Sequence, residues 1–482
     1  MNIEDLKTEI PLYVFDVGRI LEKEGFKTYL VGGSVRDILM KREPKDYDIG
    51  TNALPSQILG IFPKAISTGA KFGSIIVLLK DKEGETHSID VTTFRVEEEY
   101  IGGRWPSKVE FTDDLMIDLS RRDFTINAIA IDIGKLVDDD KNEIIYDPYK
   151  GRNDIQRKLV RAVGDPFERM KEDALRALRA CRFASVLGFK LDKGVVKAVK
   201  AVLNMIDNLS SERVRDEILK IIYDSNKPSV GLNLLRDLGI LKIWIPELLE
   251  GIGVDQPEYH AFDVYNHLVK CVDAAPHEVK LAALFHDIGK PRKKAGKHFY
   301  GHDVLGASMT REIMKRLRFS NKEIERVVRL VRWHMFYFPY DEEDFQSKKS
   351  LKREKKDISK WTDAAIRRFV RNVGGEEEID DLIKLRIADS LANPKSSFDS
   401  REIEALQRRI SEVRVLDMAI KISDLDIKGN DIIKLGFKAG PQIGIILRDL
   451  LEMVIEDPSL NDKEILLSIV RRDITKYKNK KI

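Results

Sequence analysis

Two aspartates close a glycine-rich segment, YLVGGSVRDILMKREPKDYDIGT, at residues 29–51. Its pattern predicts a strand that ends at Gly32 and Gly33, followed by the N-terminus of a helix, where backbone N–H groups can approach a phosphate. Asp46 and Asp48 are two residues apart, so on a strand both carboxylates point to one face. Converging carboxylates bind Mg²⁺ when substrate phosphates complete its octahedron. The segment therefore predicts a two-metal nucleotidyl-transfer site. A glycine turn beside an unrelated surface aspartate pair is the alternative.

A second candidate is the triplet Arg121, Arg122 and Asp123 in RRDFTINA, residues 121–128. The two guanidinium groups offer donors to triphosphate oxygens, and Asp123 can accept a hydrogen bond from a ribose hydroxyl. The same triplet also fits a plain surface ion pair, so its interpretation depends on the neighbouring motifs.

A third candidate lies in KEDALRALRACRF, residues 171–183, which we predict to be one helix. It carries Glu172, Asp173, Arg176 and Arg179. Asp173 and Arg176 would project near one another and offer an acceptor beside a donor fork. The alternative is a helical i,i+3 salt bridge, which contributes about a few tenths of a kcal/mol.

The histidines are clustered, since seven of the eight fall between residues 260 and 334. The string ALFHDIGKP at 283–291 is typical of HD-type phosphohydrolase domains, and other histidines and aspartates match the pattern of that family. Imidazoles and carboxylates on facing helices suit a transition metal, whose bound water loses its proton near neutral pH. The resemblance implies one metal held by His267, His286, Asp287 and Asp389, a second completed by His302 and His334, and a phosphate contact from Lys290. A degenerate HD fold retained for structure is the alternative.

Short β-rich runs must position the first of these sites. They lie at residues 27–31, 46–50, 64–68, 73–80, 85–94 and 124–133, after a predicted helix over the first 25 residues. Turn-forming Gly, Pro and Asp separate them, as in a small sheet. From about residue 154 the pattern is almost wholly helical. The sequence therefore predicts an α+β head followed by a long α-helical body and tail.

Composition limits the class of protein. A length of 482 residues predicts two to four domains, and 43% hydrophobic residues suffice for packed cores. Two cysteines, Cys181 and Cys271, cannot build a disulfide framework or a four-thiolate zinc site. No apolar run of about 18 residues and no signal-peptide pattern is present, so we expect a soluble, cytoplasmic protein without a membrane span.

The net charge of +3 hides a segregation along the chain. Residues 1–149 carry 19 Lys/Arg against 28 Asp/Glu, whereas residues 150–220 carry 17 against 10. An acidic front followed by a basic middle indicates a metal-using site beside a polyanion track. Uneven solvated surface is the equally weighted alternative.

Together the motifs resemble a known family. GGSVRD followed by DYD looks like the class II tRNA nucleotidyltransferase and bacterial poly(A) polymerase family, within the polymerase-β-like superfamily. RRDFTINA resembles the block that reads the ribose, DPYKGRNDI (147–155) the hinge, KEDALRALRACRF the base-reading helix, and LSSERVRDEI (209–218) the block that braces it. The resemblance covers residues 26 to about 250. It implies catalytic aspartates at 46 and 48 that hold Mg²⁺, and nucleotide-binding residues Gly32, Gly33, Arg36, Arg121, Arg122, Asp123, Asn127, Glu172, Asp173, Arg176, Arg179 and Arg182.

The resemblance also implies a division into four parts: a head (1–153), a neck and body (154–250), an HD domain (251–400) and a helical, tRNA-binding tail (401–482). In the tail, Gly436, Gly440 and Gly444 beside Lys438 offer amides to a phosphate, although ordinary turns fit equally well. The basic terminus RRDITKYKNKKI either contacts RNA or frays.

The segment FRVEEEYIGGRWPSKVEF at 94–111 resembles a flexible loop that is kept in CCA-adding and A-adding members and shortened in those that add only C. Arg95, Glu97, Tyr100 and Arg104 are the loop positions carried over, and a charged surface β-loop is the alternative. Asp90 is a weaker candidate for a third carboxylate; a plain edge-strand aspartate fits as well.

These resemblances imply addition of CCA to the 3′ end of tRNA from CTP and ATP, with a second, metal-dependent hydrolytic activity. The closest alternative is an A-adding enzyme that works with a separate CC-adding one. A poly(A) polymerase fits less well, because its base-reading helix usually lacks the Glu172–Asp173 pair. An HD hydrolase whose head only binds RNA is the alternative from another class.

Overall fold

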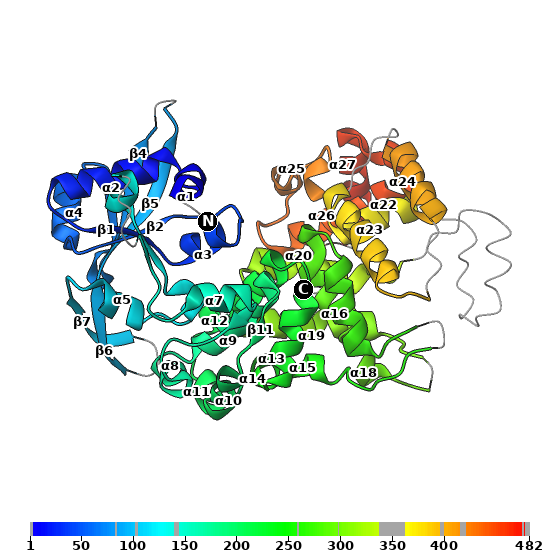
Figure 1. Cartoon of the computed structure of the whole chain (residues 1–482). Helices are drawn as coiled ribbons and strands as arrows, with labels where there is room; N and C mark the ends of the chain where they lie inside the picture. The colour runs from blue at the N-terminus through cyan, green and yellow to red at the C-terminus, as the bar shows by residue number, and fades with distance from the viewer. Residues whose placement is uncertain are drawn as a thin grey trace. The chain divides into compact units, whose positions relative to one another are not determined.

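The computed structural model describes residues 3–81, 84–101, 105–138, 144–257, 260–296, 298–336, 362–395, 400–414, 421–474 and 477 (Figure 1). The chain divides into two compact units, Met1–Leu249 and Glu250–Ile482, which we describe separately.

The first unit begins with a seven-stranded mixed sheet in the order β3-β4-β5-β2-β1-β8-β9. All neighbouring strands are antiparallel except β2 and β5, which run parallel. The strands are β1 Thr28–Val31, β2 Asp48–Thr51, β3 Ala65–Gly69, β4 Ser74–Lys80, β5 Thr86–Thr93, β8 Ala130–Asp132 and β9 Ile145–Tyr146. The expected sheet is confirmed. The run 124–133 supplies only β8, because Thr125–Asn127 form a 3₁₀ turn and a helix starts at Ile133.

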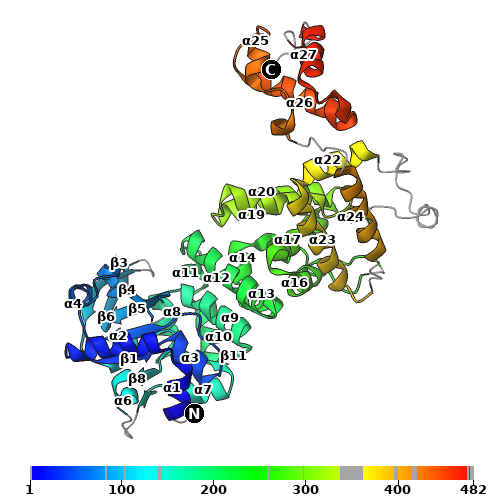
Figure 2. The same cartoon turned by 90° about the horizontal axis from the view of Figure 1, so that it is seen from above.

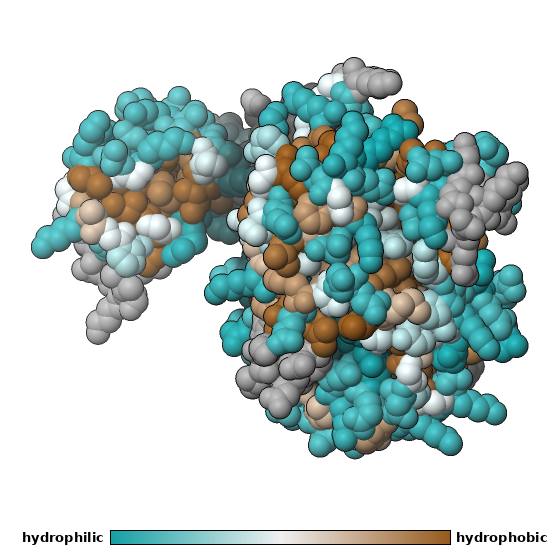
Figure 3. Space-filling view, turned by 60° about the vertical axis from the view of Figure 1, so that its left-hand side comes forward, coloured by the Kyte–Doolittle hydropathy of each residue, from teal (hydrophilic) through white to brown (hydrophobic). Residues whose placement is uncertain are grey.

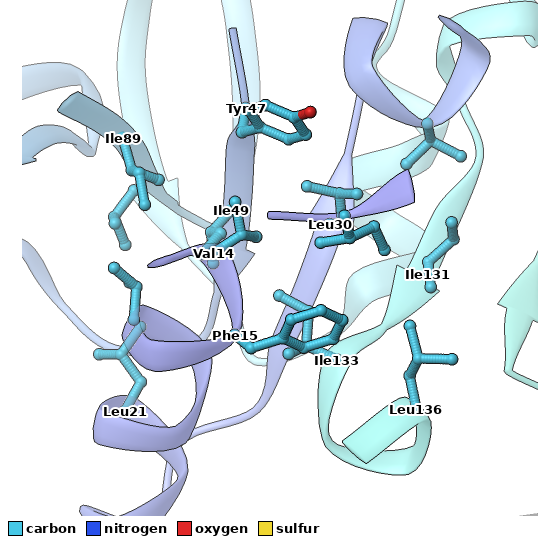
Figure 4. Packing of buried hydrophobic residues seen from close by; sticks show 14 of the residues in the cluster. Val14, Phe15, Leu21, Leu30, Tyr47, Ile49, Ile89, Ile131, Ile133 and Leu136 are labelled. Carbon is cyan, nitrogen blue, oxygen red and sulfur yellow. The ribbon is translucent and has the colours of Figure 1, made fainter. Parts of the chain in front are cut away.

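Two layers of side chains bury this sheet. On one face, α2 (Leu12–Lys23) and α6 (Ile133–Val137) pack onto Leu30 and Ile49 (Figure 4). On the other face, Tyr29 and Val31 contact Leu115 of α5 (Leu115–Ser120). Successive strand residues alternate between faces, which is why neighbours in β1 join different clusters.

The first 25 residues form two helices rather than the single expected one. These are α1 (Ile3–Glu9) and α2, and Pro11 occupies the N-cap of α2. Proline fixes φ and disfavours a helical conformation for the residue before it, so the helix restarts there. A helix α3 (Gly33–Leu39) follows β1, and α4 (Pro55–Ile61) follows β2. A separate antiparallel hairpin joins β6 (Arg95–Ile101) to β7 (Trp105–Phe111).

Helices build the rest of the first unit, as expected. They are α7 Gly151–Gln156, α8 Pro166–Glu172, α9 Leu175–Leu187, α10 Lys193–Ala201, α11 Leu203–Ile206, α12 Ser211–Asp224, α13 Pro228–Asp237, α14 Ile240–Trp244 and α15 Pro246–Leu249. Two short strands, β10 (Leu159–Val160) and β11 (Lys190–Leu191), pair in parallel among them. Helix α9 packs against both α12 and α13, and ten of its residues are buried.

In the second unit, α23 (Glu376–Leu391) packs against α16 (Val264–Ala274), α17 (Lys280–Phe285) and α20 (Asn321–Trp333). The neighbouring helices are α18 Lys290–Lys293, α19 His302–Arg316, α22 Asp363–Val373 and α24 Ser400–Arg414. Helices α25 (Gly429–Lys434), α26 (Pro441–Glu456) and α27 (Lys463–Arg472) share a hydrophobic core of their own (Figure 2). Buried Arg367 of α22 donates to the Ile455 carbonyl of α26 at 2.8 Å and so connects this core to the rest of the second unit.

The surface of both units is mainly hydrophilic on the face shown in Figure 3, with apolar side chains in patches between polar ones. Among the described residues, no helix is both long enough and apolar enough to cross a membrane.

Candidate active sites

Three carboxylates gather where β2 meets β5. Asp48 is the first residue of β2 and lies level with Asp90 of β5 in the strand register. Asp46 precedes the strand, so the expectation that both residues of the pair lie on it is wrong for Asp46. The pKa of Asp48 is raised to about 6: burial is the largest cause, the charges of Asp46 and Asp90 add to it, and Arg122 opposes them. Burial likewise raises the pKa of Asp90, although the Ser74 hydroxyl opposes it. A divalent cation here would stabilise the ionised carboxylates.

Gly32 allows the backbone to pass between Asp48 and Arg122. It has φ +80°, a left-handed conformation, and a Cβ there would lie 3.1 Å from Arg122 Nη1 and 3.2 Å from Asp48 Oδ2. Helix α3 begins at the next residue, Gly33, so the expected order of strand, two glycines and helix is confirmed. A larger residue at position 32 would be strained by the left-handed φ and would press against both side-chain ends.

Asp118, which the sequence reading missed, orients both arginines of the RRD triplet. It is 2% exposed, and its Oδ1 accepts from Arg121 Nη2 at 2.7 Å while Oδ2 accepts from Arg122 Nη2 at 3.1 Å. Burial alone would raise the pKa of Asp118, but the two guanidinium groups outweigh it and lower the pKa. Helical spacings of three and four residues from Asp118 to the arginines were the available signal.

Asp123 is buried, and both of its carboxylate oxygens accept hydrogen bonds. Its Oδ1 accepts from Asn127 Nδ2 at 3.0 Å and from the Phe124 N–H at 2.8 Å, and its Oδ2 accepts from Arg179 Nε at 2.8 Å. Burial opposes ionisation, but Arg179 and the Asn127 amide dominate and lower the pKa of Asp123 to about 2. Asn127 also accepts from Arg36 Nη1 at 2.7 Å. The structure thus brings these four predicted residues together in one network, in which a ribose hydroxyl would have to share the oxygens of Asp123.

The segment 171–183 is not one helix. Helix α8 ends at Glu172, Asp173 is extended at φ −143°, and α9 starts at Leu175. Asp173 accepts from the Leu175 N–H at 3.0 Å, so its carboxylate favours the break as a cap does. The prediction that Asp173 and Arg176 lie on one helix is therefore wrong.

Each member of the expected acceptor–donor pair has another partner. Arg176 is 8% exposed; it pairs with Glu172 at 2.5 Å and donates to the Arg121 carbonyl at 3.1 Å. Asp173 pairs with Arg213 of α12 at 2.6 Å. An acceptor and a donor fork are thus present in this region, each held by a neighbour of opposite charge.

Helix α12, which contains most of the predicted bracing block, contacts α9 through Glu217. This residue is 3% exposed and lies 2.6 Å from Arg182 Nε and 3.9 Å from Arg179 Nη1. The guanidinium groups of Arg179 and Arg182 also lie over the ring of Phe183, at 5.4 and 4.1 Å from its centroid. These contacts orient the two arginines.

The predicted loop is the β6–β7 hairpin. In the strand register Glu97 faces Val109 and Tyr100 faces Pro106. Arg95 donates to the Phe72 carbonyl. Arg104 lies outside the described residues.

In the second unit, four histidines and two aspartates converge. His267 Nε2 lies 2.9 Å from Asp389 Oδ1, and His286 Nε2 lies 3.3 Å from Asp287 Oδ2. On the other side of Asp287, its Oδ1 lies 3.2 Å from His302 Nε2 and 3.4 Å from His334 Nε2. The structure therefore brings together all six predicted ligands, in two groups that share Asp287.

Three of these imidazoles are oriented by backbone carbonyls three residues earlier. Nδ1 of His286, His302 and His334 lies 2.9, 2.7 and 2.6 Å from its carbonyl oxygen. A carbonyl only accepts, so Nδ1 carries a proton in each ring, and Nε2 is the atom that each ring presents to the cluster as a potential metal ligand. The sequence reading missed these carbonyls, of Ala283, Phe299 and Val331.

The donor set fits a metal centre. His267 Nε2 and His286 Nε2 are 3.2 Å apart, and His302 Nε2 and His334 Nε2 are 3.3 Å apart, so each pair presents two nitrogen ligands to one point. Oδ1 of buried Asp287 accepts no hydrogen bond from the described residues. Burial opposes the charged form of His286, but Asp287 and Asp389 outweigh it and raise its pKa to about 10. Lys290 Nζ lies 2.5 Å from Asp287 Oδ2 and donates to Gln256 Oε1 at 2.7 Å.

Family models match most of the chain. Residues 28–161 match the poly A polymerase head domain, 188–251 the probable RNA and SrmB-binding site of polymerase A, and 258–393 the HD domain. The chain therefore carries a poly A polymerase head domain, the RNA-binding region that accompanies it in polymerase A, and an HD domain.

Individual proteins with known functions are similar to part or all of the chain. The CCA-adding enzyme of Staphylococcus epidermidis is 44% identical over 206 residues, 43% of this chain and 48% of the relative. That of Lactococcus lactis is 39% identical over 248 residues, 52% of this chain and 59% of the relative. The chain thus spans about half the length of the curated relatives that it matches. The crystal structure of the Bacillus stearothermophilus CCA-adding enzyme in complex with CTP superimposes with a TM-score of 0.62 at 25% identity and covers 96% of this chain and 98% of that one.

These matches agree with the predicted fold class, a mixed-sheet head followed by helices and an HD domain. Nucleotidyltransferase and HD domains both depend on metals, and the structure contains groups that can hold a metal. The tail lies beyond the three family matches. There, Gly436 and Gly440 have φ +88° and +156°, and Tyr477 of the basic terminus is buried, with its carbonyl accepting from Gln442 Nε2 at 2.6 Å.

Proposed function

We propose that this chain adds CCA to the 3′ end of tRNA, using CTP and ATP without a nucleic-acid template. The observation that carries the proposal is the meeting of Asp48, Gly32 and Arg122 at one point, next to Asp46. Carboxylates, a close backbone and a guanidinium are the parts that a bound triphosphate and its Mg²⁺ need.

In the proposed reaction the 3′-hydroxyl of tRNA attacks the α-phosphate of the nucleotide, and pyrophosphate leaves. Asp46 and Asp48 would hold Mg²⁺, which lowers the pKa of the attacking hydroxyl and stabilises charge on the leaving group. Arg122 and Arg121 would bind triphosphate oxygens, because their guanidinium groups are already oriented by Asp118. Asp123 would accept from the ribose.

We assign base selection to Asp173 and Arg176, in the region braced by Glu172 and Arg213. Cytosine and adenine both present an amino donor beside a ring-nitrogen acceptor. One carboxylate and one guanidinium can therefore serve both bases and leave guanine and uracil with mismatched groups. Their present partners, Arg213 and Glu172, would keep both side chains ordered before the nucleotide arrives.

The experiment is extension of three tRNA substrates, ending at the discriminator base, at CC and at CCA, with labelled CTP or ATP. Addition of CCA to the first supports the proposal. Addition of A alone, to the CC end only, would identify an A-adding enzyme, and repeated A addition to all three a poly(A) polymerase. No extension of any substrate would leave the HD hydrolase with an RNA-binding head.

We further propose a second activity, metal-dependent hydrolysis of phosphate esters at the His267–His286–Asp287–His302–His334–Asp389 cluster. Two observations support it. The Nε2 atoms approach each other in two close pairs, and Asp287 Oδ1 accepts no hydrogen bond from the described residues. A transition metal there would supply a hydroxide nucleophile near neutral pH, and Lys290 would contact a phosphate oxygen. The proposed substrates, tRNA, CTP and ATP, favour a cytoplasmic location.

A further inference from the structure

The chain between two candidate metal ligands, Asp287 and His302, has an unusual composition. Residues 288–302 contain five Lys/Arg and no Asp/Glu. Three aromatic rings follow one another within it, those of His298, Phe299 and Tyr300. Basic side chains beside aromatic ones are typical of surfaces that bind single-stranded nucleic acid.

The structure divides this segment into an anchored part and an exposed part. Lys290 is 8% exposed, bonded to Asp287 and Gln256, and its Nζ lies 5.6 Å from the centroid of the Phe299 ring. Lys293 and Lys294, at the end of α18, are exposed. The positive charge near the cluster therefore lies partly inside the site and partly on the surface beside it.

The aromatic residues alternate in the same way. Phe299 is partly buried, and its carbonyl accepts from Nδ1 of His302. His298 and Tyr300 are exposed, and their rings stack with centroids 5.2 Å apart and planes 18° apart. Tyr300 is 68% exposed, the second most exposed large hydrophobic residue among those described.

The stacked pair lies close to the chemistry. Gly301, at φ +73°, connects Tyr300 to His302 at the start of α19. Two peptide units separate these residues, so their Cα atoms are within about 7.6 Å of one another. The stacked pair therefore lies beside a candidate metal ligand along the chain.

A free small phosphomonoester needs neither the stack nor the exposed lysines. We propose that the surface formed by Lys293, Lys294, His298 and Tyr300 binds the last nucleotides of a single-stranded nucleic acid and presents its terminal phosphate to the histidine cluster. The substrate of the cluster is then a polynucleotide end. This inference rests on the phosphohydrolase activity proposed above.

The reaction on a 3′-phosphate end is hydrolysis. Water forms a bond to phosphorus, the bond between phosphorus and O3′ breaks, and a proton from the water goes to O3′. The products are a 3′-hydroxyl end and inorganic phosphate, with no change in oxidation state.

The test compares two probes in the full-length protein with a divalent transition metal: a short single-stranded RNA with a 3′-phosphate, and p-nitrophenyl phosphate. Tyr300→Ala should raise KM for the RNA by about five- to a hundredfold, the range expected for one lost stacking contact. It should leave p-nitrophenyl phosphate hydrolysis unchanged. Tyr300→Trp should restore the KM for RNA.

A charge test is independent of the aromatic one. The double variant Lys293→Ala/Lys294→Ala should weaken RNA hydrolysis most at low salt and flatten its salt dependence, because fewer phosphate contacts release fewer counterions. Lys322→Ala, at the exposed start of α20 and far along that helix from His334, is the matched control and should change nothing.

Equal effects of Tyr300→Ala on both probes, or no effect on either, would overturn the inference. If the unmodified protein hydrolyses neither probe, the phosphohydrolase proposal fails by itself. The binding surface is then tested by photo-cross-linking an RNA that carries 4-thiouridine at its 3′ end. A cross-link to this surface that Tyr300→Ala removes supports the inference, and the lack of one refutes it.

Discussion

Arg179 Nη2 lies 2.7 Å from Asp123 Oδ2, and this ion pair joins helix α9 to the RRD segment 56 residues earlier in the chain. Among the described residues, neither Asp123 nor Arg179 forms a hydrogen bond or ion pair with Asp46 or Asp48. The pair nevertheless holds the ribose-binding candidate, Asp123, in place. A nucleotide that binds to Asp123 would thus be connected through Arg179 to α9, the helix that also carries Arg176.

Asp123→Asn should lower both stability and nucleotide addition. The pKa of Asp123 is about 2 in the folded protein and about 3.9 in an unfolded chain, so its ionised form stabilises the fold above about pH 4 and that contribution is lost as pH falls through 2. We expect a loss of about 2 kcal/mol in the free energy of unfolding at pH 7. Urea unfolding at pH 7 measures it, with exposed Asp207→Asn as control. Equal stability of both variants would contradict the ion pair's role.

Asp118→Asn tests whether this carboxylate positions the triphosphate arginines. Loss of the charge frees Arg121 and Arg122, so KM for CTP and ATP should rise about tenfold or more, in line with a lost charge-assisted contact. Steady-state kinetics on a tRNA ending at CC, with ATP, measure the change.

The matched control for that prediction is Asp114→Asn on the same helix. Asp114 caps α5 through the Met116 N–H at 2.7 Å, and asparagine caps equally well. Its KM should be unchanged. A similar KM for both variants would mean that Asp118 acts on folding alone.

Nucleotide addition should fall in acid below about pH 6. The pKa of Asp48 is raised to about 6, chiefly by burial, so its carboxylate is protonated below that pH and loses affinity for Mg²⁺. Higher Mg²⁺ should shift the midpoint to lower pH, because metal and proton compete for one carboxylate. Single-turnover rates at several pH values and two Mg²⁺ concentrations measure this shift. A midpoint independent of Mg²⁺ would assign it to another group.

The two proposed activities should separate by mutation. Asp48→Ala should abolish nucleotide addition, by about a hundredfold or more, and leave metal-dependent phosphate hydrolysis intact. His286→Ala should do the reverse, since it removes a ligand whose Nε2 lies 3.2 Å from that of His267. Both reactions are followed on the same preparations, with bound metal measured after dialysis. Loss of both activities in either variant would argue against two independent sites.

Short-range chemistry could be predicted from the sequence. The strand, Gly32 and the helix that begins at Gly33 lie within twelve residues, Thr28–Leu39, so local propensity determines them. The histidine ligands of the cluster could also be predicted, because a concentration of histidines in one segment is typical of a metal site.

The tertiary structure decided which groups meet. The sequence could not show that Arg176 pairs with Glu172 while Asp173 pairs with Arg213, since a capping contact to Leu175 breaks the helix at that point. It could not show that Asp46 lies outside the strand, or that Asp118 binds both arginines.

The residue types and their order along this chain thus determined what chemistry is available. Only the packing of distant segments decided its geometry, because ion pairs and metal ligands depend on distances of about 3 Å that local sequence does not specify. Asp389 and His267 illustrate this, since 122 positions separate them in sequence and 2.9 Å separates their ligand atoms in the fold.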